Sequence, residues 1–321
     1  MVAASVIAFL IVLAVAATWA SAAYRADRAE AATPAAGTFI DVMGVRIHAE
    51  VMGEGPDVVL LHGAFGSTRD FTFDLAGRLA ENYRVIAFDR PGMGYSEHTN
   101  PNHARAFAKS VESPLEQARV LAAAARELGA DRPIVVGHSF GGIVAIAWAL
   151  DHDPAALVLL AGVAMPWPGT LSPIYRSNGT ALGGGLIAPL ISAWVPGGRL
   201  KSGVENSFSP QTMPKGYAEH IGPYMPLRLS AFRATTRQVN TLRPYVVRMQ
   251  TRYARLALPI EILHGSEDKT VPMDVHSRPF SRLVKTAKLR VLDGVGHMPH
   301  HADPEAAIAA INRAAARADL R

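Results

Sequence analysis

Residues 137–141 read Gly-His-Ser-Phe-Gly and carry the clearest chemical signal in this chain. They follow an apolar run at 134–136 and precede a helical pattern that begins at Phe140, so they predict a sharp strand-to-helix turn. Glycines two residues on either side of the serine let neighbouring backbone segments approach closely. The N-terminus of the helix would favour negative charge that develops beside the hydroxyl. Ser139 is therefore the candidate nucleophile.

A serine hydroxyl is a weak nucleophile without a base, and two later loops offer the partners it needs. Asp268 lies in a loop after the apolar run 260–263, and His297 ends a Gly-Val-Gly-His segment after the run 289–292. His297 would accept the proton of Ser139 and return it to the leaving group, while Asp268 would orient the imidazole and stabilise its charged form. Singly, a loop aspartate or histidine could be a solvated or capping residue. The three together predict a catalytic triad.

The reacting carbonyl oxygen would also need hydrogen-bond donors. Residues 62–67 read His-Gly-Ala-Phe-Gly-Ser and follow an apolar run at 58–61. A tight glycine loop there could aim a backbone N–H at the same point as the N–H of Phe140, and two such donors form an oxyanion hole. Taken alone, this loop could equally be an ordinary strand-to-helix turn.

Three histidines close to the candidate residues are interpreted as structural. His300 and His301 follow Met-Pro at the start of a helix and are expected to be exposed or packed rather than to act as the base. His138 is expected to pack or to form a pocket wall. The 12 histidines show no metal-site spacing, and the chain has no cysteine, which excludes disulfides, thiolate metal sites and a cysteine nucleophile. We therefore predict no metal and no cofactor.

Short apolar runs alternate with helical patterns from Phe39 onward, and each candidate residue follows such a run. Runs 39–42 and 45–52 flank Met-Gly and predict a β-hairpin. The other predicted strands are 58–61, 84–88, 134–136, 157–160, 260–263 and 289–292, and the predicted helices include 114–128, 143–150 and 304–320. This alternation predicts an α/β fold, with a mostly parallel central sheet that helices cover on both faces.

Residues 164–255 interrupt the alternation and predict a helical cap or lid inserted between two core strands. The core would then comprise residues 38–163 and 256–321. The second half of the insertion, 227–255, has helical character with an interruption at Pro244. The insertion holds 11 basic and two acidic residues, whereas the whole chain has a net charge of only +5. Its recurring arginines predict either a solvated helix face or a surface that rests on an anionic membrane. They are Arg228, Arg233, Arg237, Arg243, Arg248, Arg252 and Arg255.

Residues 1–37 predict an N-terminal membrane anchor or signal segment followed by a linker from Ala26. Residues 2–23 carry no charge, and as a helix they would be about 33 Å long, enough to cross a hydrocarbon core of ~30 Å. Ala20-Ser21-Ala22 would fit signal-peptide cleavage, but no basic residue precedes the apolar stretch. We favour a membrane-associated chain with a single uncleaved span, with export after cleavage as the alternative. Arg25 and Arg28 would place the following domain in the cytoplasm by the positive-inside rule.

These motifs, in this order, resemble the α/β-hydrolase superfamily over essentially all of the chain from Phe39 onward. Residues 89–96, Asp-Arg-Pro-Gly-Met-Gly-Tyr-Ser, also resemble a structural turn of that family. The resemblance implies an α/β-hydrolase fold with a cap, Ala64 and Phe140 as the oxyanion-hole residues, and Asp268 rather than Glu267 as the acid. Related epoxide hydrolases and haloalkane dehalogenases use an aspartate nucleophile, so Ser139 argues against both activities.

The sequence therefore predicts an esterase- or lipase-like serine hydrolase that cleaves an ester or related acyl bond of a small, apolar substrate. A cofactor-free acyltransferase or perhydrolase on the same triad is the second hypothesis, and a non-catalytic member of the fold is the third. No nucleic-acid-binding motif accompanies the basic insertion, so nucleic acid is not an expected partner. The expected partners are the acyl substrate and, through the N-terminal segment, a membrane. The motifs specify neither the acyl chain length nor an oligomeric state.

Overall fold

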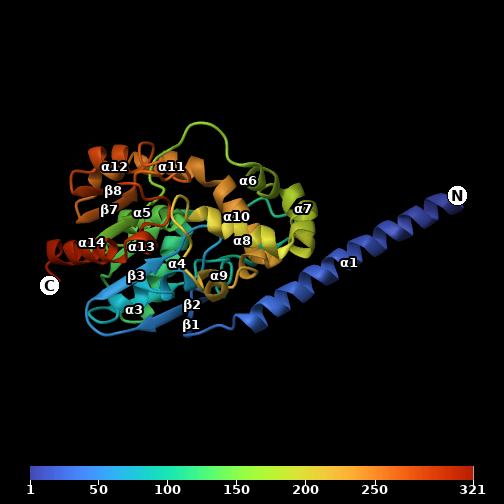
Figure 1. Cartoon of the computed structure of the whole chain (residues 1–321), viewed down its shortest axis with the longest axis horizontal. Coiled ribbons are helices and arrows are strands. Elements are labelled where there is room, and N and C mark those ends of the chain that lie inside the picture. The colour runs from blue at the N-terminus through green and yellow to red at the C-terminus, as the bar shows by residue number, and fades with distance from the viewer. Residues whose placement is uncertain (321) are drawn as a thin grey trace.

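The computed structural model describes residues 1–320, and within them eight strands form one sheet in the order β1-β2-β4-β3-β5-β6-β7-β8 (Figure 1). Strand β2 pairs antiparallel with β1 and β4, and the remaining pairs are parallel. The predicted hairpin and the predicted apolar strands are all present. The strands are β1 (Thr38–Val42), β2 (Val45–Met52), β3 (Asp57–Leu61), β4 (Arg84–Phe88), β5 (Ile134–His138), β6 (Ala156–Leu160), β7 (Ile260–Gly265) and β8 (Ala287–Leu292).

Helices cover both faces of this sheet, which confirms the predicted α/β architecture. The central strands are apolar at nearly every position because neither face meets water. One face carries α4 (Pro114–Glu127), α5 (Phe140–Asp151), α11 (Leu242–Gln250) and α12 (Ser277–Leu283), and the other carries α2 (Arg69–Thr72), α3 (Leu75–Leu79) and α14 (Pro304–Arg317). The short helices η1 (Pro101–Ala104) and α13 (Pro299–Ala302) lie in loops.

Residues 164–255, called the insertion below, leave the sheet after β6 and return at β7. They form α6 (Pro173–Asn178), α7 (Ala181–Trp194), α8 (Gly197–Ser207), α9 (Tyr217–Ile221), η2 (Met225–Leu227), α10 (Leu229–Asn240), α11 and η3 (Tyr253–Arg255). The helical interruption expected at Pro244 lies instead at Thr241, between α10 and α11. Pro244 falls in the first turn of α11. Backbone N–H groups in the first turn of a helix have no intrahelical acceptor, so a proline there costs no hydrogen bond.

Helix α1 (Val2–Ala32) is longer than the sequence suggested. The linker expected from Ala26 was wrong for residues 26–32, because this segment has neither glycine nor proline and its Ala29 is buried. Residues before Thr18 project away from the domain (Figure 1). By length and composition α1 could cross a membrane, a test that an N-terminal signal sequence also passes.

Two arginines of the insertion, Arg233 and Arg237, are buried. The prediction that the arginines form one solvated or membrane-facing surface was therefore wrong for these two residues. Arg237 donates hydrogen bonds to the carbonyl oxygens of His103, Arg105 and Ala106 at 3.0, 3.0 and 2.5 Å. Arg233 donates from Nε to the carbonyl of Gly184 at 2.6 Å. Both arginines therefore satisfy backbone acceptors inside the protein, a role that sequence spacing does not reveal.

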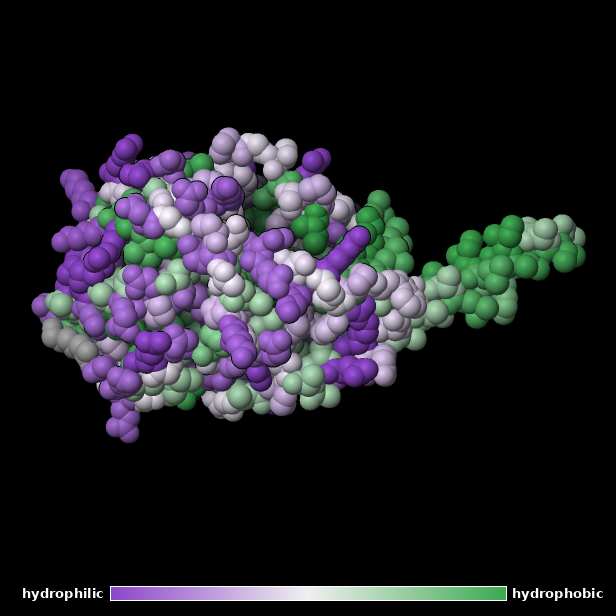
Figure 2. All heavy atoms as spheres, in the orientation of Figure 1, coloured by the Kyte–Doolittle hydropathy of each residue, from purple (hydrophilic) through white to green (hydrophobic). Residues whose placement is uncertain are grey.

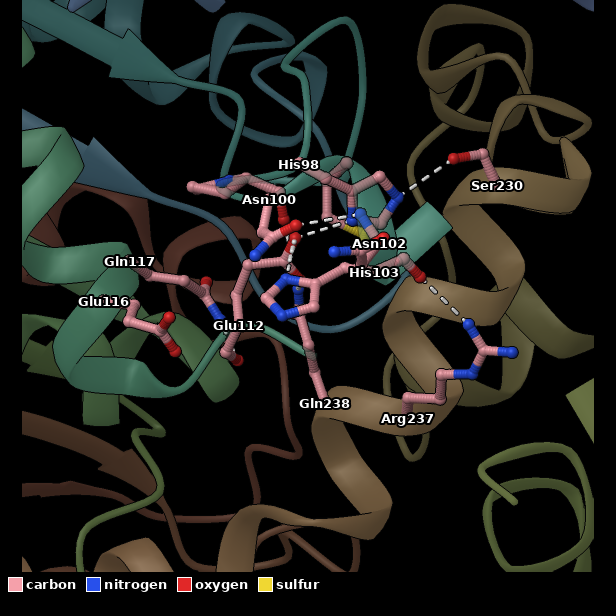
Figure 3. A network of polar contacts seen from close by, with 12 residues as sticks. His98, Asn100, Asn102, His103, Glu112, Glu116, Gln117, Ser230, Arg237 and Gln238 are labelled. Atoms are coloured by element: carbon pink, nitrogen blue, oxygen red, sulfur yellow. Dashed lines mark hydrogen bonds and ion pairs between the residues drawn. The ribbon is translucent and has the colours of Figure 1, made fainter. Parts of the chain in front are cut away.

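A buried polar network joins the loop after β4 to α10 (Figure 3). His98 contacts Oε1 of Glu112 at 2.6 Å through Nδ1 and the hydroxyl of Ser230 at 3.1 Å through Nε2. Gln238 donates to Oε2 of Glu112 at 3.1 Å, and His103 lies 3.3 Å from Oε1. Glu112 thus holds core and insertion together as a buried anion. Hydrogen bonds and charge attraction from the two histidines lower the pKa of Glu112 despite its burial.

We predict that Glu112→Gln lowers the free energy of unfolding by on the order of 2–3 kcal/mol, since it removes charge-assisted hydrogen bonds. The loss should be larger at pH 6 than at pH 8.5. The hydrogen bond to Glu112 raises the pKa of His103 above its usual 6.5, with burial and Arg237 opposing it. The stabilisation from this pair is therefore complete below pH 6.5 and disappears as pH rises through the raised pKa.

Urea denaturation of the purified chain at the two pH values measures this effect. Glu127→Gln, at an exposed carboxylate near the end of α4, is the matched control and should change stability little at either pH. If Glu112→Gln lowers the stability equally at both pH values, Glu112 does not raise the pKa of His103.

Candidate active site

Ser139 joins the end of β5 to the start of α5 with a backbone that non-glycine residues rarely adopt, φ 51° and ψ −117°. Two hydrogen bonds hold the turn: the N–H of Ser139 donates to Leu160 at 3.1 Å, and its carbonyl accepts from Val163 at 2.9 Å. Strand β6 and the residues that follow it therefore fix the turn from one side. The strained backbone of Ser139 directs its side chain away from the sheet.

Glycines make this turn possible because neighbouring backbones leave no room for a Cβ. A Cβ at Gly137 would overlap the carbonyl of Gly141, and one at Gly141 would overlap the carbonyl of Leu61 at the end of β3. A Cβ at Gly142 would press on Gly162. The Gly-x-Ser-x-Gly spacing thus reflects close contact between β3, β5, β6 and α5.

The structure brings Ser139, His297 and Asp268 into one hydrogen-bonded chain. Oγ of Ser139 lies 2.9 Å from Nε2 of His297, and Nδ1 of His297 lies 2.8 Å from Oδ2 of Asp268. Each follows the carboxyl end of a parallel strand, so the three meet at one edge of the sheet. In the tautomer this geometry requires, Nδ1–H donates to the carboxylate and Nε2 accepts from the hydroxyl.

Asp268 is held rigidly by its own loop. Its Oδ1 accepts from the backbone N–H groups of Thr270 and Val271 at 2.8 and 2.9 Å. Its Oδ2 also lies 3.1 Å from Nε2 of His264. Burial alone would raise the pKa of Asp268, but hydrogen bonds from His264 and His297 outweigh it and hold the pKa below its usual value. The residue is therefore an anion at neutral pH. Glu267, its neighbour, is exposed.

His297 is buried and only 7% exposed, and this burial is the main reason that its pKa lies below 6.5. Hydrogen bonding and charge attraction from Asp268 oppose the shift, while His138 and His264 add to it. A lowered pKa leaves the imidazole neutral at pH 7, the form in which Nε2 can accept a proton.

Ala64 and Phe140, the expected oxyanion-hole residues, flank the serine. Phe140 begins α5 directly after Ser139, and Ala64 follows Gly63, where an added Cβ would lie 3.0 Å from the Cβ of Ser139. Among the described residues, neither the N–H of Ala64 nor that of Phe140 has a hydrogen-bond acceptor. Neither N–H group is therefore used by another group of the described chain.

A second polar cluster supports the loop that contains Ala64. Nε of Arg90 donates to the carbonyl of His62 at 2.8 Å and Nη2 to that of Gly63 at 3.0 Å. Burial, with the nearby Arg90 charge, lowers the pKa of His62 to about 3, and its neutral Nε2 accepts from the N–H of Arg90 at 3.0 Å. Asp89 is buried and accepts from the N–H groups of Thr68 and Tyr95, both at 2.8 Å. These residues shape the loops and lie outside the hydrogen-bonded chain of Ser139.

Ser139 and His297 open into a cavity of about 480 Å³ between the sheet edge and the insertion. The insertion contributes apolar side chains to it that no motif had indicated, because they come from separate helices. They include Ile174, Tyr175, Leu200, Val204, Leu227 and Phe232. Phe65 stacks on Tyr175 with ring centroids 5.9 Å apart. The space is of the size that small-molecule sites occupy, and its walls suit an apolar group.

Asp70 is the functional-site neighbour that sequence reasoning missed. It accepts from the hydroxyl of Tyr217 at 2.7 Å and lies 2.9 Å from Nε2 of His301 and 3.4 Å from Nε2 of His300. His138 contacts Asp70 at 3.5 Å and the carbonyl of His297 at 3.0 Å. His300 and His301 therefore pack inside the protein, and His138 lines the cavity. No local pattern marks Asp70, because its partners are distant in sequence.

Histidines and carboxylates converge at two places in the structure, which the spacing of the histidines in the sequence had not indicated. Two groups of two histidines and one carboxylate have ligand atoms within 4.8 Å of one another: Asp70 with His300 and His301, and Glu112 with His98 and His103. Mutual hydrogen bonds and ion pairs account for both arrangements.

We predict that Tyr217→Phe destabilises the protein by about 1–2 kcal/mol and Asp70→Asn by more, because the latter weakens several bonds to one buried charge. The double variant should show a coupling energy of about 1 kcal/mol, since the two side chains share a hydrogen bond. Denaturant unfolding of the three variants measures the cycle. Tyr245→Phe, at a tyrosine of α11 outside this cluster, is the control. Strict additivity would mean that the insertion does not rely on this contact.

Comparison with known proteins identifies the family of this chain. Residues 58–311 match the model of the alpha/beta hydrolase family, and the chain belongs to that family. An uncharacterized protein of Mycobacterium tuberculosis is 26% identical over 86% of this chain and 80% of its own length. A pimeloyl-[acyl-carrier protein] methyl ester esterase of Vibrio vulnificus is 34% identical over 34% of this chain and 37% of its own length. The crystal structure of an alpha/beta hydrolase fold protein from Burkholderia ambifaria is 26% identical, with a TM-score of 0.69 over 86% of this chain and 96% of that one.

Proposed function

We propose that this protein is a serine hydrolase that cleaves a carboxylic ester or related acyl bond of a small, apolar substrate. The observation that carries the proposal is the hydrogen-bonded chain from Ser139 through His297 to Asp268 at the wall of an apolar cavity. A hydrolase family with an esterase among the relatives supports the same reaction class.

The geometry supports a two-step mechanism that passes through an acyl-enzyme. Oγ of Ser139 attacks the carbonyl carbon while Nε2 of His297 takes its proton, and Asp268 stabilises the imidazolium. The N–H groups of Ala64 and Phe140 would donate to the oxyanion, an interaction worth several kcal/mol, roughly 3 for each donor. His297 then gives the proton to the leaving alcohol, which leaves an acyl-enzyme. Water attacks this ester with His297 again as base, and Ser139 is regenerated.

We also propose that α1 is retained as a membrane anchor rather than cleaved as a signal peptide. Residues on both sides of the candidate cleavage point contact the insertion: Ser21 donates to the carbonyl of Ala193 at 3.2 Å, and Arg25 donates to it at 2.8 Å. The guanidinium of Arg233 lies 5.2 Å from the ring centroid of Trp19. Cleavage after Ala22 would remove Trp19 and Ser21 and uncover their partners.

Ser139→Ala should abolish ester hydrolysis and labelling by a fluorophosphonate while the protein stays folded. The expected loss of kcat is on the order of 10³-fold or more, because triad members act as a unit. Ser281→Ala, at a serine on α12 outside the cavity lining, should hydrolyse and label normally. Hydrolysis of p-nitrophenyl esters and in-gel fluorescence measure both effects. Full labelling of Ser139→Ala would place the nucleophile elsewhere.

The acidic limb of the kcat/KM profile should have its midpoint below pH 6.5. His297 must be neutral to accept the proton, and burial lowers its pKa, so the active form persists to lower pH than for a free imidazole. Activity should rise with pH through that lowered pKa and stay level between pH 7 and 8. A midpoint above 6.5 would contradict the assignment of His297 as a buried, neutral base.

Cells that express the full chain should retain it in the membrane fraction, with residues 2–23 intact. Fractionation followed by N-terminal sequencing tests this expectation, and alkaline carbonate extraction, which strips peripheral proteins, is the control. A soluble form that begins near Ala23 would instead identify residues 1–22 as a cleaved signal peptide.

A further inference from the structure

Helix α7 presents its large apolar side chains outward and its small residues inward. Its 14 residues include no charged side chain. The buried positions are Gly183, Gly184, Gly185, Ala188, Pro189, Ser192 and Ala193. The exposed ones include Leu182, Leu186, Ile187, Leu190 and Trp194, with exposures of 69%, 60%, 41%, 52% and 57%. These five residues are called the α7 face. A helix on a water-soluble domain shows the opposite arrangement, with polar residues outward.

The α7 face lies directly beside α1. The indole N–H of Trp194 donates to the hydroxyl of Thr18 at 3.3 Å, and Arg25 donates to the carbonyls of Ala193 and Val195, both at 2.8 Å. Figure 2 shows the hydrophobic surface over α7 next to the point where the hydrophobic part of α1 leaves the domain. The first charge of α1, on Arg25, thus lies at the C-terminal end of α7.

The length of α1 that projects from the domain helps to decide what covers the α7 face. Residues 2–17 are exposed and project alone, and at ~1.5 Å per residue they extend only about 24 Å. A hydrocarbon core is ~30 Å thick. A span must therefore include residues 18–23, which is also where the charge-free stretch ends. These residues pack against α7, so a bilayer that contains them meets α7 as well.

We propose that the α7 face is immersed in the same leaflet that α1 enters, so that the domain is partly embedded in lipid rather than merely tethered to it. This inference rests on the membrane anchor proposed above. Exposed basic residues on either side of α7, namely Arg176 on α6 and Arg199 and Lys201 on α8, are placed to reach lipid headgroups.

A second copy of the chain could also cover an apolar face, but it would leave the shortfall in the length of α1 unexplained. Lipid accounts for both the outward apolar side chains and the length of the span. Helices α6 and α8 flank α7 and contribute Ile174, Leu200 and Val204 to the cavity wall. An apolar ester dissolved in the bilayer would therefore meet helices that also line the cavity of Ser139.

The chain has no cysteine, so single-cysteine variants of the full-length protein can report on each surface. Leu186→Cys and Leu190→Cys would carry the environment-sensitive fluorophore NBD on the α7 face. Leu10→Cys reports on α1. Leu283→Cys is the matched control, because this leucine is 39% exposed on α12, at the end of the domain opposite α7 (Figure 1). Each variant is reconstituted at low density in phosphatidylcholine vesicles, with and without nitroxide-labelled acyl chains.

Fluorophores at 186 and 190 should emit at shorter wavelength in vesicles, lose fluorescence to the acyl-chain nitroxides and resist quenching by aqueous iodide, as should the one at 10. The fluorophore at 283 should respond only to iodide. If position 10 is in lipid but 186 and 190 are quenched by iodide alone, the anchor stands and this inference fails. If position 10 is also in water, the anchor itself is wrong. Protection of 186 and 190 from both quenchers would mean that protein covers the face, which overturns the proposal in favour of a second copy.

Discussion

The close approach of four backbone segments around Ser139 is the constraint on which the rest of the site depends. The elbow at Ser139 needs β3, β5 and β6 so close together that Gly137, Gly141 and Gly142 have no space for a Cβ. This crowding holds the serine at φ 51° and leaves the N–H groups beside it unpaired within the described chain. In the proposed mechanism, the nucleophile and the donors that stabilise the oxyanion are thereby held together before any substrate binds.

Buried charges then attach the insertion to this scaffold at the positions that shape the cavity. Glu112 bonds to Gln238 of α10, Arg237 binds carbonyls of the loop after β4, and Asp70 holds Tyr217 of α9. Each of these groups has several partners, as a buried ion must to offset the loss of water. The same insertion contacts α1, so the site, its apolar wall and the N-terminal helix form one connected body.

The sequence predicted the sheet well because its strands are short apolar runs between turn residues, a pattern that burial on both faces imposes. It also indicated the three residues of the hydrogen-bonded chain, because the elbow at 137–141 and the loops holding Asp268 and His297 each come after a strand. It failed where contacts join distant segments. Neither the burial of Arg233 and Arg237 nor the role of Asp70 leaves a local signature, and the contacts that bury Ala29 in the extended part of α1 leave none either.

The central claim is that Ser139 carries the acyl group during turnover, and the location of that group tests it most directly. The protein would be mixed with a slowly hydrolysed p-nitrophenyl ester, quenched in acid during the burst, digested and analysed by tandem mass spectrometry. We expect the mass of the acyl group on the peptide that contains Ser139, at that residue alone, and its loss on longer incubation. An acyl group on another residue, or steady turnover with no acylated peptide at any time, would contradict the account.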